Sequence, residues 1–255
     1  MENEQHGSAE HFLDEGLITD VLRIVKTGKE ASVHLCRANR SMTAEDLLAL
    51  KVYHPLDRRD FRDESLYRDG EWIKERRVRV ALEKKTRFGR EVQGAIWVDR
   101  EWETLRALAE AGVSVPRPVA ATEDAILMTY IGDEGQAAPQ LRSYRPDADE
   151  AQELFRQVMK AIELMLYRNV VHGDLSPYNV LVWEGTATII DLPQAVDPRK
   201  NRHAERLLER DVTRMCEYFE RYGVRSSPQG LASDLSTAWR FADLVPEELR
   251  VELEL

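Results

Sequence analysis

Cysteine is nearly absent from this sequence: Cys36 and Cys216 are the only two among 255 residues. They lie far apart, and neither stands in the Cys-x-x-Cys or Cys/His spacing of a zinc site. Two isolated thiols argue against a disulfide framework and are typical of a reducing compartment. We therefore expect a cytoplasmic protein with two reduced, buried cysteines.

Long apolar runs are also missing, since no stretch of about 18 apolar residues occurs that could cross a membrane. Residues 1–10 are polar and acidic and lack the apolar segment of a signal peptide. We expect no membrane association. The net charge is −10 and the isoelectric point is near 5.2, which argues against a protein that coats nucleic acid, because such binding depends on neutralising many phosphates.

A glycine-rich phosphate loop is absent, because neither the Walker A pattern nor GxGxxG occurs. A single glycine lies in a turn between two segments of alternating polarity, residues 18–26 and 31–37, which we predict to form a hairpin. The turn is either a plain connection or a cover for nucleotide phosphates. Its candidate contacts with a nucleotide are Thr27, Gly28, Lys29, Glu30, Ala31 and Ser32.

A short apolar strand is predicted over residues 46–53, and it contains one lysine, Lys51. Burying a lysine in such a run is costly unless an anion meets it. A lysine in this position is typical of kinases, where it contacts nucleotide phosphates and pairs with a helix glutamate. The alternative is a strand lysine that points into solvent.

An amphipathic helix is predicted where apolar residues recur between positions 96 and 109, with Gly112 following at its end. Glu101 and Glu103 both lie on it, and either could reach Lys51. We favour Glu101 because it lies beside the apolar face, whereas Glu103 suits an exposed position.

Two further segments organise the first half of the chain. Residues 54–90 form a densely charged, locally basic insert, which is either solvated surface or a patch for RNA or an acidic partner. A hairpin over residues 119–131 is followed by a polar segment, residues 132–136, that fits a hinge. We predict an N-terminal lobe over residues 1–131 and a C-terminal lobe over 132–255. Backbone groups of Thr129 and Ile131 are candidates for adenine binding.

The chemistry is concentrated in the pattern HxDxxxxN at residues 172–179, followed by an apolar hairpin that ends in Asp191. Phosphoryl transfer depends mainly on alignment and charge neutralisation. Asp174 suits the orientation of an acceptor hydroxyl, and Asn179 and Asp191 offer the oxygen ligands that Mg²⁺ prefers. His172 is interpreted as a structural residue of the loop. Turn capping is the alternative for an isolated Asp–Asn pair, but the longer pattern is far more specific.

These segments resemble the RIO family of atypical serine/threonine protein kinases, over about residues 18 to 225. The family's first subfamily is the most similar, because the second carries an N-terminal winged-helix domain and too few residues precede Thr27 to build one. The matching segments are residues 27–31, 50–53, 100–105, 112–116, 172–179, 190–196 and 208–212.

The resemblance implies an α+β, bilobal, protein-kinase-like fold. Its N-terminal lobe would be an antiparallel sheet with one main helix, and its C-terminal lobe mostly helical with a short hairpin. It also implies ATP beneath the 27–32 turn, with Mg²⁺, or Mn²⁺ in its place, as the metal. In that reading Lys51 contacts the phosphates and pairs with Glu101, Asp174 is catalytic, and Asn179 and Asp191 bind the metal.

The sequence also differs from ordinary protein kinases. Gly173 replaces the arginine of HRD, and Asp191 is followed by Leu-Pro in place of Phe-Gly. Only about a dozen residues separate Asp191 from the next predicted helix, near residue 203, so no activation segment with an APE motif fits. The usual platform for a peptide substrate is therefore missing. The insert falls where the family has a loop that can carry autophosphorylation, and Ser65 is a candidate.

Three functions follow from this pattern. The leading hypothesis is Mg-ATP-dependent phosphorylation of serine or threonine, in the protein itself or in an unidentified protein substrate, with ATPase activity as a possible companion. The second is phosphorylation of a small-molecule hydroxyl, since aminoglycoside- and choline-type kinases share HxDxxxxN. The third is an ATP-gated assembly factor, with RNA or a ribosome-assembly partner bound through the basic insert.

Overall fold

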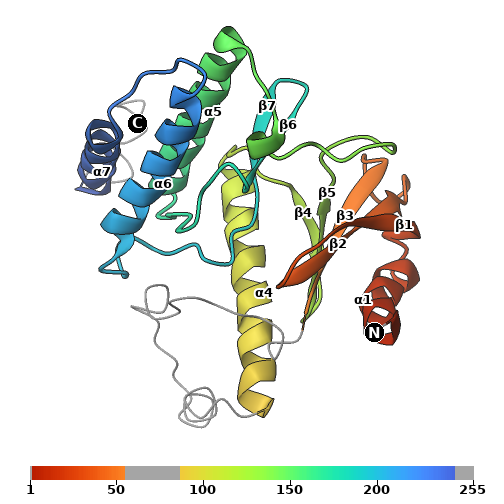
Figure 1. The fold of residues 1–255 in the computed structure, drawn as a ribbon. Coiled ribbons are helices and arrows are strands. Elements are labelled where there is room, and N and C mark those ends of the chain that lie inside the picture. Colours follow the sequence, from red (N-terminus) through yellow and green to blue (C-terminus); the bar gives the residue numbers. More distant parts are fainter. Residues whose placement is uncertain (1, 55–86, 245–255) are drawn as a thin grey trace. The chain divides into compact units, whose positions relative to one another are not determined.

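The computed structural model describes residues 2–54 and 87–244 (Figure 1). Ser65 and nearly all of the charged insert lie outside these residues. The described chain forms two compact units. The first unit comprises residues 2–54, 87–106 and 116–138, and the second comprises residues 107–115 and 139–244.

The first unit is built on one antiparallel sheet of five strands in the order β1-β2-β3-β5-β4 (Figure 1). Alternating polarity favours strands here, and the predicted hairpins are present. The central strand β3 places Lys51 between Val33 of β2 and Ile126 of β5. The strands are β1 (Ile18–Thr27), β2 (Ala31–Ala38), β3 (Leu47–Tyr53), β4 (Pro118–Ala121) and β5 (Ala125–Thr129).

The N-terminal helix α1 (Glu2–Asp14) was not predicted from the sequence. Its residues are mostly polar, and among its described side chains, residues 8–14, Ala9 and Phe12 join the apolar core of the first unit, so the amphipathic signal is weak. Phe12 is fully buried in a cluster that includes Ile18 and Leu48. The helix is also tied to the sheet, because the Ser8 hydroxyl donates to Asp124 Oδ2 at 2.6 Å.

Helix α4 (Arg87–Glu110) corresponds to the predicted amphipathic helix but begins earlier than its apolar pattern. The described side chains confirm its apolar face, because Val98, Leu105 and Leu108 are each no more than 2% exposed. Glu101 lies on this face and is only 1% exposed. The face therefore carries one carboxylate into an apolar environment.

The division between the units falls after Ala138, whereas the sequence suggested a boundary after Ile131. The segment between them folds back on itself, because Gly132 and Ala137 form a β-bridge and the Ala138 N–H donates to Ile131 O at 3.0 Å. Gly132 has a φ of 133°, and a Cβ there would lie 2.5 Å from Gln136 O. Only glycine fits this tight turn of the backbone. The turn keeps the polar segment, residues 132–136, in the first unit.

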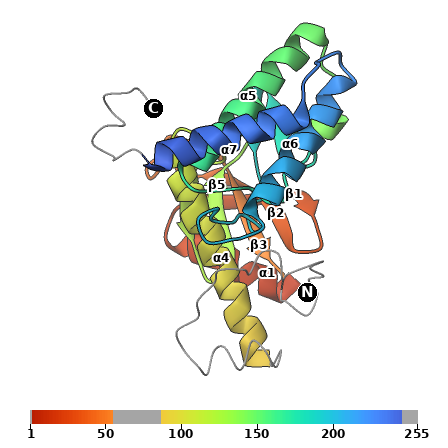
Figure 2. The same ribbon diagram turned by 90° about the vertical axis from the view of Figure 1, so that its left-hand side faces the viewer.

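The second unit is mainly helical and contains one two-stranded hairpin. Helix α5 begins at Asp147, whose carboxylate accepts the Glu150 N–H at 2.9 Å, a standard N-cap. Figure 2 shows α7 lying across α5 and α6, and all three helices contact one another. The elements are η2 (Leu141–Ser143), α5 (Ala148–Tyr167), β6 (Val180–Trp183), β7 (Thr186–Ile189), α6 (Ala204–Glu220) and α7 (Pro228–Leu244).

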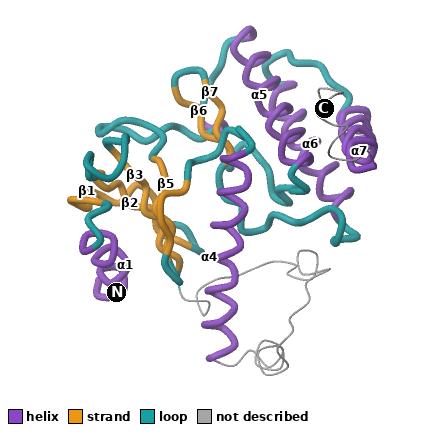
Figure 3. The backbone as a smooth tube through the Cα atoms, turned by 180° about the vertical axis from the view of Figure 1, so that it is seen from behind, coloured by secondary structure: helices purple, strands orange, loops and turns teal. Residues whose placement is uncertain are grey.

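The first unit combines the five-stranded sheet with α1 and most of α4, whereas the second is mainly helical, and Figure 3 colours the strands orange and the helices purple. Among the helices of residues 2–54 and 87–244, none combines the length and the apolar character needed to cross a membrane.

Candidate active site

In the first unit, Lys51 and Glu101 form a nearly buried ion pair. The Lys51 Nζ lies 2.8 Å from Glu101 Oε1 and 3.0 Å from Oε2, and the two side chains are 12% and 2% exposed. The Tyr53 hydroxyl also donates to Glu101 Oε2, and the Lys51 ammonium lies 5.0 Å from the centre of the Tyr53 ring. The favoured partner, Glu101, is thus the one that reaches Lys51, while Glu103 pairs with Arg106 on the surface.

The turn between β1 and β2 exposes Thr27, Gly28 and Lys29. It is closed by a hydrogen bond from the Gly28 N–H to Ala31 O at 2.9 Å. Ala31 and Ser32 are both buried, and the Ser32 hydroxyl lies 3.3 Å from His54 Nε2. We therefore assign Ser32 to holding the turn, and the exposed residues remain the candidates for nucleotide contact.

The two hinge candidates use some of their backbone groups within the first unit. The Thr129 N–H donates to Arg117 O at 2.9 Å, and the Thr129 hydroxyl accepts the Arg117 N–H at 2.8 Å. The Ile131 carbonyl accepts the Ala138 N–H. The role of both residues in adenine binding stays a prediction.

In the second unit, the loop before β6 is fixed by a buried histidine. The Asp174 N–H lies 3.3 Å from His172 Nδ1, and His172 Nε2 lies 3.1 Å from Ile190 O. Because Nδ1 accepts a hydrogen bond, Nε2 carries the proton and donates to Ile190. Burial lowers the pKa of His172, which keeps the ring neutral in this arrangement. The contacts fit the structural role predicted for His172.

A second buried carboxylate holds the same loop from helix α6. Asp211 is 2% exposed and accepts the Gly173 N–H at 2.8 Å and the Leu175 N–H at 3.0 Å. Burial raises the pKa of Asp211 to about 7, against the lowering effect of these two N–H donors and of the Arg210 and Arg214 guanidinium groups. Gly173 has a φ of 80°, a conformation that the arginine of HRD would adopt only with strain.

Helix α6 also holds the Asp174 side chain. Arg214 Nη1 donates to Asp174 Oδ1 at 2.8 Å, and Arg210 donates to the Gly173 carbonyl. The guanidinium of Arg214 thus fixes one carboxylate oxygen of Asp174. The second oxygen, Oδ2, is the one available to orient a hydroxyl.

The β6–β7 hairpin explains how Asn179 and Asp191 come together. Val180 pairs with Ile189, so the residue before β6 and the residues after β7 lie side by side. The Ile190 N–H donates to Asn179 O at 3.0 Å. Asp191 has a φ of 70°, a left-handed conformation that aspartate tolerates better than most residues.

The donor set of this hairpin fits Mg²⁺. The Asn179 side-chain nitrogen donates to Asp174 O at 3.0 Å, so its amide oxygen is not used in that contact, and Asn179 lines the pocket. Within the described residues, no group of three or more His, Cys, Asp and Glu side chains is placed to hold a metal. Mg²⁺ is usually held by one or two carboxylates together with waters and phosphates, so one carboxylate and one amide oxygen are a suitable partial set.

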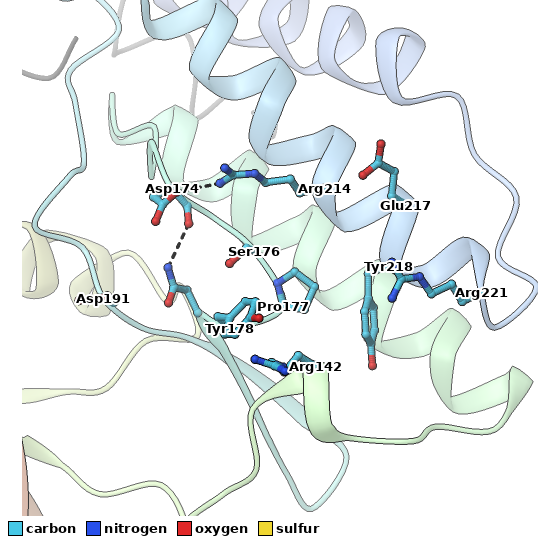
Figure 4. Close-up of a pocket in the computed structure, with 11 residues that line it drawn as sticks. Arg142, Asp174, Ser176, Pro177, Tyr178, Asp191, Arg214, Glu217, Tyr218 and Arg221 are labelled. Atoms are coloured by element: carbon cyan, nitrogen blue, oxygen red, sulfur yellow. Dashed lines mark hydrogen bonds and ion pairs between the residues drawn. The ribbon is translucent and has the colours of Figure 1, made fainter. Parts of the chain in front are cut away.

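Asp174, Asn179 and Asp191 line one pocket of the second unit, with a volume of about 720 Å³. Figure 4 shows it extending from these residues past Pro177 toward Tyr218. The other lining residues, all from the second unit, are Arg142, Ser176, Pro177, Tyr178, Arg214, Glu217, Tyr218 and Arg221. The pocket thus combines oxygen ligands with three guanidinium groups.

The sequence did not indicate roles for Tyr53, Arg142, Asp211 and Arg214. Tyr53 lies two residues after Lys51 on the same face of β3, so the period of a strand could have suggested its contact with Glu101. Asp211 and Arg214 act on a loop nearly 40 residues earlier in the chain, and spacing alone gives no signal for such a contact.

Comparison with known proteins agrees with this arrangement. Residues 33–230 match the RIO domain family. The chain belongs to the RIO family of atypical serine/threonine protein kinases. The RIO-type serine/threonine-protein kinase Rio1 of Thermoplasma acidophilum is 34% identical over 144 residues, which cover 56% of this chain and 74% of that protein. Rio1 of Haloferax volcanii is 30% identical over 209 residues, covering 81% and 66% of the two chains.

The human serine/threonine-protein kinase RIO1 is 28% identical over 214 residues, which cover 84% of this chain but only 35% of the human protein. A solved structure of Rio2 kinase from Chaetomium thermophilum, in a complex with ADP/Mg²⁺ and phosphoaspartate, has a TM-score of 0.68 at 22% identity and covers 90% of this chain and 64% of its own. The predicted family, its Rio1-like character and the α+β kinase-like fold are confirmed. The class of enzyme, a protein-kinase phosphotransferase, is confirmed at the level of the family.

Proposed function

We propose that this chain is a Mg-ATP-dependent RIO-type kinase that phosphorylates serine or threonine, including its own. The observation that carries the proposal is the convergence of Asp174, Asn179 and Asp191 on one pocket of the second unit. The buried Lys51–Glu101 pair of the first unit supports it, because an ammonium held in this way is suited to nucleotide phosphates. The chain spans less than half the length of the eukaryotic RIO1 kinases that it matches.

In the proposed reaction, the serine Oγ attacks the γ-phosphorus of ATP. The new O–P bond forms as the bond to the bridging oxygen breaks, and that oxygen leaves on ADP with the electron pair. Asp174 Oδ2 orients the hydroxyl and receives its proton, while Arg214 fixes Oδ1. Mg²⁺, when bound, neutralises charge on the phosphates, and the oxygens of Asn179 and Asp191 would hold it.

The test uses the purified full chain with γ-labelled ATP and Mg²⁺, and measures acid-stable phosphoserine and phosphothreonine. We expect Asp174→Ala to lower transfer by about 10²- to 10⁴-fold, the usual contribution of a positioned acid–base group. Asp149→Ala, which removes an exposed carboxylate on α5, is the matched control and should keep full activity. Absence of labelled phosphoserine and phosphothreonine in the native protein, or equal labelling in the Asp174→Ala variant, would disprove the proposal.

A second function, ATP hydrolysis through a phosphoaspartate, is favoured by the complex in which the related Rio2 kinase was solved. Asp191 is the candidate here, because it is exposed in the same pocket. Its carboxylate oxygen would attack the γ-phosphorus as ADP leaves, and water would then release phosphate and restore the carboxylate. This reaction is supported if hydroxylamine removes the labelled phosphate from the protein and if the Asp191→Asn variant takes up no such label. Labelled phosphate that resists hydroxylamine would count against it.

A further inference from the structure

Three arginines line the candidate site pocket beyond Asp174. Arg214 lies on α6, and Arg221 is the C-cap residue that follows it about two helical turns later in a helical conformation, so both project on the same side of that helix. Arg142 is the middle residue of the short η2 segment and lines the pocket from another wall. Figure 4 shows Arg142 and Arg221 on the side of the pocket near Tyr218, and Asp191 on the opposite side.

These guanidinium groups differ in their partners. Arg214 is engaged by Asp174 at 2.8 Å. Arg142 and Arg221 are exposed, and within residues 2–54 and 87–244 neither forms an ion pair. Arg142 is nevertheless held in place, because its guanidinium carbon lies 4.2 Å from the centre of the Tyr178 ring and its backbone N–H donates to Pro177 O at 2.9 Å. This cation is therefore fixed beside the loop that carries Asn179.

The carboxylates of the pocket do not neutralise this pair. Asp174 is matched by Arg214, and the proposed function assigns Asp191 to the metal. Only Glu217 remains, and Figure 4 shows its carboxylate directed away from Arg142. The part of the pocket near Tyr178 and Tyr218 thus presents two cations that no described carboxylate engages. A guanidinium held in a pocket, as that of Arg142 is over the Tyr178 ring, is suited to a carboxylate or phosphate.

We propose that Arg142 and Arg221 bind an acidic side chain, a glutamate, aspartate or phosphorylated residue, that flanks the acceptor serine of a protein substrate. The inference rests on the proposed function and names its acceptor class. Asp174 orients the acceptor hydroxyl, so residues beside that serine enter the rest of the pocket, where the two arginines lie. The phosphoryl group still passes from ATP to the serine Oγ, the serine proton passes to Asp174, and ADP leaves.

A protein segment is favoured over RNA by the charge of the whole molecule. A net charge of −10 repels a long polyanion at distance, whereas one or two acidic side chains on a peptide meet only the local field. Two cations in one pocket also suit a short acidic motif. They substitute for part of the peptide platform that the missing activation segment would have supplied.

The experiment compares peptides that are identical except beside a single serine, where they carry glutamate, phosphothreonine or glutamine. We expect the kcat/KM of the acidic peptides to exceed that of the glutamine peptide by about tenfold, the ordinary size of one charge-assisted contact. In the Arg142→Ala/Arg221→Ala variant the ratio should fall below about twofold. Arg225→Ala is the matched control, because Arg225 is also exposed and near the end of α6 but does not line the pocket, and it should keep the ratio.

The glutamate and phosphothreonine peptides distinguish a carboxylate from a phosphate as the preferred group. Equal kcat/KM for acidic and neutral peptides, or a preference that survives in the double variant, overturns the inference and leaves the proposed function intact. The inference is likewise overturned, with the proposed function intact, if the protein phosphorylates itself but neither binds any peptide nor transfers phosphate to one. The inference is also overturned if a single-stranded RNA competes in a way that depends on Arg142 and Arg221 while the acidic and neutral peptides react equally well. That result would assign the surface to RNA. Loss of all phosphotransfer, to the protein and the peptides alike, is failure of the proposed function itself.

Discussion

At the scale of residues, the proposed function depends on how Asp174 is held. Its N–H is directed at His172, its carbonyl accepts the Asn179 amide, and its carboxylate is fixed by Arg214. The first two contacts come from the same loop, and the third comes from α6. Arg214 is therefore a positioning residue, since it acts through Asp174.

We predict that Arg214→Ala lowers kcat by about 10- to 100-fold, the cost of a catalytic group misplaced by roughly an ångström. The KM for ATP should change little, because the proposed nucleotide contacts do not include Arg214. Arg214→Lys should recover part of the loss, since it keeps the charge without the planar geometry. Steady-state kinetics measure this, with Arg240→Ala as the control, because Arg240 pairs with Glu205 on the surface. A rise in KM alone would contradict the positioning role.

The buried Asp211 leads to a prediction about pH. Its pKa of about 7 in the folded protein lies above the value of 3.8 for an ordinary aspartate, so the folded state keeps a proton that the unfolded state releases. The stability from this group is complete below about pH 4 and is lost as the pH rises toward 7.

Asp211→Asn removes this titration and also places an amide against one of the two backbone N–H donors. We expect the variant to be less stable by about 1–3 kcal/mol near pH 5, with the difference from the native protein shrinking by about 2 kcal/mol between pH 5 and 8. Urea unfolding of both proteins at each pH measures this. A difference that stays constant or grows with pH would show that Asp211 is ionised throughout.

Part of the site could be predicted from the sequence, because residues with suitable side chains occur there at a characteristic spacing. A carboxylate and an amide five residues apart, followed by a hairpin that ends in a second carboxylate, restrict the possible reactions strongly. The contacts of Asp211 and Arg214 could not be predicted, because they depend on how α6 packs on the loop. Burial of Ser32 likewise depends on His54, which follows a different strand.

At the scale of elements, the strands of both sheets and helices α5 and α6 could be predicted from the sequence. Their apolar residues recur with the period of a strand in the strands and with the period of a helix in the helices. Helix α1 was not, since Ala9 and Phe12 provide too few apolar positions to reveal a period. Its attachment depends on one large side chain that fills the core of the first unit.

We therefore predict that Phe12→Ala destabilises the first unit by about 3–5 kcal/mol, the usual cost of removing a buried phenylalanine. Leu13→Ala is a matched control on the same helix, because Leu13 is 37% exposed and its truncation should cost about 0.5 kcal/mol or less. Chemical denaturation followed by tryptophan fluorescence distinguishes the two variants. Equal losses in both would mean that α1 does not depend on its buried face.

At the scale of the whole molecule, the described chain forms two compact units, the first with the five-stranded sheet and the second mainly helical. The predicted boundary followed a change in composition, whereas the limit in the structure is set by the backbone hydrogen bonds of residues 131–138. The transfer of Ala107–Val115 to the second unit could not be predicted, because α4 continues across that limit without a break.

Stability of the whole chain should respond to nucleotide and metal together. A ligand that binds only the folded state at about 100 times its Kd adds about 2.7 kcal/mol, which for a chain of this size raises Tm by roughly 5–10 °C. We predict that ADP with Mg²⁺ produces such a shift and that ADP with EDTA produces a smaller one. In Asp191→Asn, which replaces a proposed metal ligand, the two conditions should give the same Tm, whereas the surface variant Asp149→Asn should keep the difference. Differential scanning calorimetry of the three proteins in both conditions measures this, and a Mg²⁺-dependent shift that survives in Asp191→Asn would remove Asp191 from the metal site.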